Sequence, residues 1–119
     1  MATTKGFDKY TIRVTGGNSG RVALLLCYSG NSFVGRIDFY PEGASLPNDY
    51  LWHPNPVSDY VVLHMPMNRF ESVMSIVRNE KPLNLYINVN RGTGASTPGS
   101  GYLATTDKEP VGEEEGTAG

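Results

Sequence analysis

The chain has 119 residues, of which 39% are hydrophobic and 18% are charged, a length and composition typical of one compact domain. No apolar run reaches the roughly 20 residues that cross a bilayer as a helix, which excludes a helical membrane protein. The single cysteine, Cys27, excludes an intramolecular disulfide, and the first residues lack the apolar core of a secretory signal. We therefore expect a cytoplasmic location.

The net charge of −2 is unevenly distributed along the chain. Residues 107–119 hold five acids and one lysine, whereas residues 1–106 hold nine basic and seven acidic residues and carry a net charge of +2. We expect the acidic tail, 107–119, to be disordered, because it has too few apolar residues to pack. The nearly neutral body disfavours nucleic acid as a partner without excluding it.

Residues 1–7 are expected to form a disordered lead, and residues 8–106 a single β-rich domain. Tyr10, Ile12 and Val14 alternate with polar residues, which predicts a strand with one buried face.

The segment Arg21–Tyr40 forms the centre of the predicted fold. Val22–Cys27 is apolar at every position, which predicts a strand covered on both faces, and a turn at 29–32 leads into the next strand. Gly35 in the middle of that strand predicts a bulge or a close backbone approach. Residues 8–40 thus form a three-stranded antiparallel meander.

Residues 41–58 contain four prolines and no periodicity, which predicts a long loop. Tyr50, Leu51 and Trp52 are its large apolar side chains. They are suited either to binding a partner or to plugging the core, and the sequence does not distinguish these roles.

One helix is expected at about 69–79, after a fourth strand at 59–65. Its apolar residues recur at helical spacing, and Pro82 ends it. Asn68 and Glu71 have the spacing of a capping box. The residues of the apolar stripe are Phe70, Val73, Met74 and Val77.

Residues 83–90 show the clearest two-residue alternation, and residues 101–106 form a final strand that pairs with them. The order β-β-β-loop-β-α-β-β predicts a mainly β fold, at the margin of α+β. We expect an antiparallel β-sandwich or an open barrel with a helix over one opening.

No catalytic or metal-binding motif is present, and no cofactor is implied. The two histidines, His53 and His64, have no second ligand at a suitable spacing, and Cys27 lies in the most apolar strand. Enzymatic activity is therefore disfavoured, although a site assembled only in space stays open.

The remaining candidates suggest binding. Arg13 and Arg36 lie on polar strand faces and can form a basic stripe, or they can pair with nearby acids. Arg91 begins a glycine-rich loop that can curl around a phosphate or simply turn. The outward residues of the 83–90 strand, including Tyr86, can extend a sheet across a two-fold dimer.

We therefore expect a non-enzymatic binding module that self-associates, with a dimer as the first expectation. Its ligand is a protein or a small anionic molecule near residues 41–58, and its candidate contact residues are Tyr50, Trp52, His53, Arg13, Arg36, Arg91 and Tyr86. Two alternatives stay open: a nucleotide-sequestering or single-stranded nucleic-acid-binding barrel, and a small hydrolase or isomerase.

Overall fold

A computed structural model describes residues 2–16, 20–53, 59–89 and 96–105. The acidic tail and Arg91, which the sequence analysis singled out, lie outside the described residues. In chain order the elements are β1 (Ala2–Phe7), β2 (Lys9–Val14), β3 (Ala23–Ser29), β4 (Ser32–Tyr40), β5 (Asp49–Trp52), β6 (Tyr60–Pro66), a 3₁₀ turn (Met67–Arg69), α1 (Phe70–Asn79), β7 (Leu83–Val89) and β8 (Ser96–Thr105).

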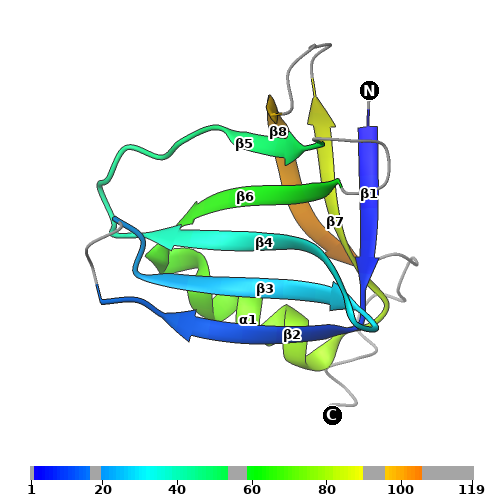
Figure 1. Cartoon of the computed structure of the whole chain (residues 1–119). Helices are drawn as coiled ribbons and strands as arrows, with labels where there is room; N and C mark the ends of the chain where they lie inside the picture. The colour runs from blue at the N-terminus through cyan, green and yellow to red at the C-terminus, as the bar shows by residue number, and fades with distance from the viewer. Residues whose placement is uncertain (1, 17–19, 54–58, 90–95, 106–119) are drawn as a thin grey trace.

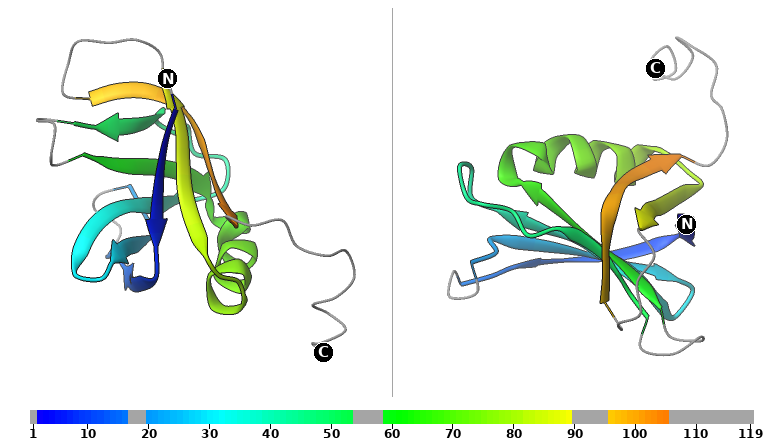
Figure 2. Two further views of the ribbon diagram at one scale, coloured as in Figure 1. Left: turned by 90° about the vertical axis from the view of Figure 1, so that its right-hand side faces the viewer. Right: turned by 90° about the horizontal axis from the view of Figure 1, so that it is seen from above.

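The eight strands form one mixed sheet in the order β1-β7-β8-β5-β6-β4-β3-β2, which curls until it is nearly closed into a barrel. Strands β5, β6, β4, β3 and β2 run side by side, and β8, β7 and β1 cross behind one end of them (Figure 1). Helix α1 lies against the inner side of the curled sheet (Figure 2). The prediction of a mainly β, open-barrel fold with one helix is confirmed.

One pair of strands departs from the antiparallel arrangement. Strands β4 and β6 pair in parallel, with Ile37 opposite Leu63. Parallel neighbours need a long crossover between them, and residues 41–59 provide it. The expectation of a loop over all of 41–58 is wrong, because residues 49–52 form β5, which pairs with both β6 and β8.

The first residues were expected to be disordered, and this expectation is wrong. They form β1, which pairs along its whole length with β7, from Ala2 opposite Asn88 to Phe7 opposite Leu83. The only hydrophobic residues of this segment are Ala2 and Phe7, at its two ends, so its sequence carries no alternation. Its order comes from the hydrogen-bonding edge that β7 offers, and Phe7 is buried in the core.

Strand β2 occupies the other end of the sheet, where both of its faces are exposed. The meander β2-β3-β4 is confirmed, but the half-buried face predicted for β2 is wrong. Tyr10, Ile12 and Val14 are opposite core residues of β3, yet they are 37%, 38% and 81% exposed, so they are not buried as the alternation predicted.

The core lies between the inner face of the sheet and α1. Leu25 and Cys27 of β3 are fully buried in it, while Leu24 on the outer face is only 7% exposed. The predicted central strand is therefore covered on both sides over most of its length. The alternation of β7 is also confirmed, since its four apolar residues, Leu83, Leu85, Ile87 and Val89, are all buried.

Gly35 shows both features predicted for it. The β3–β4 register shifts beside it, and a Cβ atom on Gly35 would lie 2.5 Å from Leu85 Cδ1 and 2.6 Å from the Val61 carbonyl oxygen. Strand β4 can approach β7 across the barrel only because this position has no side chain.

Helix α1 matches the expected range, and Val73, Met74 and Val77 face the core. The predicted capping box is not formed. Asn68 lies inside the preceding 3₁₀ turn, and the helix begins after Arg69 without a side-chain cap.

Candidate functional site

Most of the predicted contact residues lie on the outer face of the sheet and contact other residues of the same chain. Leu51 is in the core, while Tyr50 and Trp52 are half-buried on the outer face. The Trp52 ring lies 6.4 Å from that of Tyr60, which in turn packs edge-on against Phe33 at 4.9 Å. Tyr50 and Trp52 thus anchor the outer face rather than standing free on a loop.

His53 and Tyr86 also have partners in the chain. The Nε2 atom of His53 lies 2.6 Å from Thr97 Oγ1, and the ring of Tyr86 stacks on that of Tyr102 at 4.5 Å. Strand β7 is an interior strand, paired with β1 on one side and β8 on the other. The expectation that it extends the sheet across a dimer is therefore wrong, because it has no free edge.

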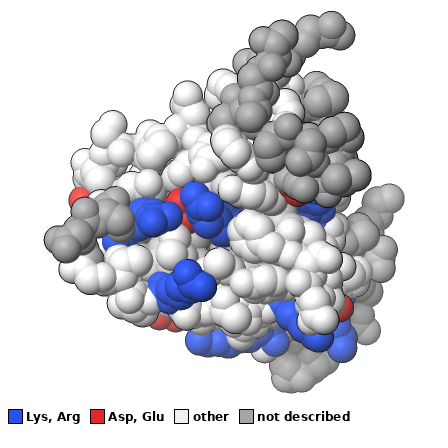
Figure 3. Space-filling view, in the orientation of Figure 1, with Lys and Arg blue, Asp and Glu red and all other residues white. Residues whose placement is uncertain are grey.

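Arg36 does not join Arg13 in a basic stripe. Its Nε atom donates a hydrogen bond to Asp38 Oδ1 at 2.9 Å, and Arg21 Nη1 lies 3.6 Å from Asp38 Oδ2. Burial lowers the pKa of Arg36, but the charge of Asp38 and its hydrogen bond outweigh this effect and raise the pKa. Arg13 is exposed on β2, and Leu24 of β3 lies between it and Asp38 of β4. Basic and acidic groups are accordingly mixed on this face, as Figure 3 shows.

His64 and Asp38 are both enclosed on the outer face, with 4% and 2% of their side chains exposed. The Nε2 atom of His64 lies 3.7 Å from Asp38 Oδ2 and its Nδ1 atom 3.5 Å from Asp49 Oδ1. Nδ1 has no hydrogen-bond partner among the residues that the structure describes. The rings of Tyr40 and Tyr50 flank His64 at 5.8 and 5.9 Å.

This cluster combines an imidazole, two carboxylates and two phenols, but neither described cavity borders on it. Asp49 accepts hydrogen bonds from the amides of His64 and Gly101, so it ties β6 and β8 together. Within the described residues, no group of three or more His, Cys, Asp or Glu side chains is placed to hold a metal ion.

Cys27 is fully buried, and burial raises the pKa of its thiol from the ordinary value of 9.0 to about 12. The thiolate is therefore scarce at neutral pH, as expected of a core residue. Above pH 9 the thiol of the unfolded chain loses its proton, whereas the thiol of the folded protein keeps it. The free energy of unfolding is therefore unaffected by this group below about pH 9. It falls by about 1.4 kcal/mol per pH unit as the pH rises from about 9 towards 12.

We expect urea denaturation of Cys27→Ala to give a lower stability than the wild type at pH 8, because of the cavity left behind. The difference should shrink between pH 9 and pH 10.5, since the variant lacks the thiol. If the free energies of unfolding of the two proteins change equally with pH over this range, the raised pKa of the Cys27 thiol is contradicted.

The larger of the two described cavities lies elsewhere, between the two ends of the sheet. It has a volume of about 680 Å³, within the range of small-molecule sites. Strand β1, strand β2, the end of α1 and the segment that follows the helix form its walls. We call it the seam groove, and its lining residues are Phe7, Asp8, Tyr10, Val77, Arg78, Asn79, Glu80, Lys81, Pro82 and Leu83.

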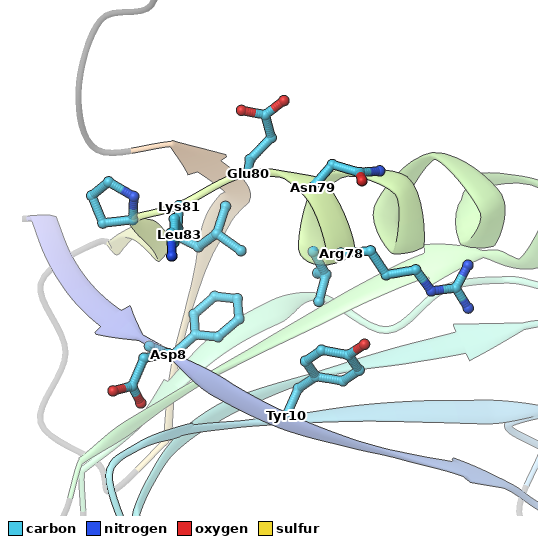
Figure 4. A pocket seen from close by; sticks show the side chains of 10 residues that line it. Asp8, Tyr10, Arg78, Asn79, Glu80, Lys81 and Leu83 are labelled. Carbon is cyan, nitrogen blue, oxygen red and sulfur yellow. The ribbon is translucent and has the colours of Figure 1, made fainter. Parts of the chain in front are cut away.

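The acidic and the basic side chains around the seam groove point in different directions. Figure 4 shows Tyr10 rising from β2 towards the helix and Arg78 running along the helix above it, whereas the carboxylates of Asp8 and Glu80 point away. Asp8 is held there because its Oδ1 accepts a hydrogen bond from the amide of Gly30 at 3.0 Å. The apolar groove is therefore bordered by the exposed cations of Arg78 and Lys81.

The seam groove has no signature in the sequence, because its residues come from two distant segments that show only ordinary core and helix patterns. No helix of the described residues is long and apolar enough to cross a membrane. Comparison of the chain with protein-family models, with curated proteins and with solved structures found no match. The functional inference therefore depends on the geometry of the seam groove.

Proposed function

We propose that the chain is a non-enzymatic binding module that holds a small amphipathic anion, an apolar body with one carboxylate, in the seam groove. The observation that carries this proposal is an apolar cavity of about 680 Å³ with two cationic side chains at its border. The ligand matches the small anionic molecule expected from the sequence. Its place is different, because no lining residue comes from 41–58.

The walls and the border contribute different terms to binding. Phe7, Val77 and Leu83 supply apolar surface, and about eight methylenes buried against them would gain roughly 6 kcal/mol at about 0.8 kcal/mol each. Association entropy offsets part of this gain. Arg78 and Lys81 add orientation, because their cations attract the carboxylate to the open side of the groove.

The test compares decanoate with decanol, its neutral counterpart, in displacing the fluorescent probe 8-anilinonaphthalene-1-sulfonate. We expect the wild-type protein to bind decanoate more tightly than decanol. Arg78→Gln should weaken decanoate about fivefold, which corresponds to about 1 kcal/mol for one exposed cation, and should leave decanol unchanged.

Arg69→Gln provides the matched control, because Arg69 is also an exposed arginine but lies at the opposite end of the helix, outside the groove. It should bind both ligands as the wild type does. Equal decanoate affinity in the wild type and in Arg78→Gln would reject the proposed function.

A further inference from the structure

Strand β2 has one free hydrogen-bonding edge. It lies at the end of the sheet and, within the described part of the chain, pairs only with β3. The Thr15 amide donates to the Val22 carbonyl at 3.1 Å, which continues the β2–β3 register. Since hydrogen-bonded residues alternate along an antiparallel strand, the backbone groups of Tyr10, Ile12 and Val14 point away from β3.

The same three residues expose apolar side chains on the inner side of the sheet. Tyr10 is 37%, Ile12 is 38% and Val14 is 81% exposed. A free edge that combines open backbone groups with apolar side chains is the kind that pairs with another strand. At the opposite end of the sheet, β1 has hydrophobic residues only at its two ends and lacks this combination.

We propose that β2 is the interface of a homodimer, in which β2 of a second copy adds antiparallel to it about a two-fold axis. Two sheets of eight strands then become one continuous sheet of sixteen. The proposal does not depend on the ligand of the seam groove.

The charges on β2 select one register. Three symmetric registers pair at least two of the three outward residues of β2 with outward residues of the second copy, and they are centred on Thr11, Ile12 or Arg13. Centring on Thr11 puts Lys9 of each copy opposite Arg13 of the other, and centring on Arg13 puts the two Arg13 side chains opposite each other. Both place like charges directly across the ladder, which is destabilising.

Centring on Ile12 avoids these contacts. It places Thr11 of one copy opposite Arg13 of the other on the outer face. On the inner face Tyr10 is then opposite Val14, and the two Ile12 side chains meet at the axis. In this register apolar side chains are opposite apolar ones, and each arginine is opposite a threonine. A second copy of β2 therefore fits this edge better than a strand of arbitrary sequence.

The first experiment measures mass by sedimentation equilibrium on the whole chain at about 100 µM. The wild type should have about twice the 13.0 kDa of one chain, and Ile12→Lys should have the mass of a monomer, because it places two cations together at the axis. Thr4→Lys, an exposed position on the other edge strand, should leave the dimer intact. A monomeric wild type, or a dimer broken by Thr4→Lys and not by Ile12→Lys, overturns the proposal.

The second experiment tests the register with single cysteines at residues 11, 12 and 13 under mild oxidation. Residues opposite each other in a hydrogen-bonded pair have Cα atoms about 5.5 Å apart, within disulfide range. Ile12→Cys should form covalent dimers at least tenfold faster than Thr11→Cys or Arg13→Cys, and buried Cys27 contributes little background. Fastest cross-linking at residue 11 or 13 overturns the proposed register.

Discussion

Gly35→Ala is expected to destabilise the protein by about 3 kcal/mol and to lower its melting temperature by roughly 10 °C. The added Cβ atom would lie 2.6 Å from the Val61 carbonyl oxygen and 2.5 Å from Leu85 Cδ1. The carbonyl belongs to the neighbouring strand, so it cannot move without disturbing the β4–β6 ladder. Thermal and urea denaturation followed by circular dichroism measure the effect.

Gly16→Ala provides the control for this substitution. A Cβ atom at Gly16 would meet nothing within 4 Å, so the free energy of unfolding should change by no more than about 0.5 kcal/mol. Equal effects at the two positions would contradict the close approach of β4 and β7 across the core.

Asp38→Asn is expected to cost roughly 3 kcal/mol, because it removes the charge that two arginines share. Asp38 is 1% exposed, and removal of one partner from a buried ion pair typically costs about 3–5 kcal/mol. The side chains of Arg21 and Arg36 are 29% and 22% exposed, so they regain part of their hydration, and the lower end of this range applies. Urea denaturation at pH 7 measures the loss.

Asp59→Asn breaks a more exposed pair and serves as the comparison. The side chains of Lys5 and Asp59 are 26% and 29% exposed, and such pairs contribute about 1 kcal/mol or less. If Asp38→Asn costs no more than Asp59→Asn, the Asp38 cluster does not stabilise the outer face.

Local periodicity predicted the elements in which the pattern of buried and exposed residues is regular from one end to the other. The alternation of β7 and the apolar run of β3 identified strands, and the stripe through Val73, Met74 and Val77 identified the helix. The expectation failed where the environment of a strand is decided by a distant neighbour. Strand β1 is ordered by β7, which is distant in the sequence, and β2 is exposed on both faces because it is an end strand of the sheet.

The candidate residues show the same division. Arg36 was identified as a surface cation, and its partner Asp38 is on the same strand face two residues away, a spacing that the sequence displays. The convergence of Asp49 on His64 depends on β5 lying between β6 and β8, which no local pattern in residues 41–58 reveals. The seam groove requires knowledge of where both ends of the sheet meet the helix.

Strands β1 and β2 belong to opposite borders of the sheet, and Asp8 alone separates them in the chain. The two strands diverge from this residue at a wide angle (Figure 1). The opening of the barrel is thus a wedge with a covalent apex, whose width there is limited to a few ångströms by the chain itself. The apex blocks a bound molecule at the narrow end of the wedge, so a longer ligand must extend towards the broad end. The length of the ligand is therefore limited at the apex and not at the broad end.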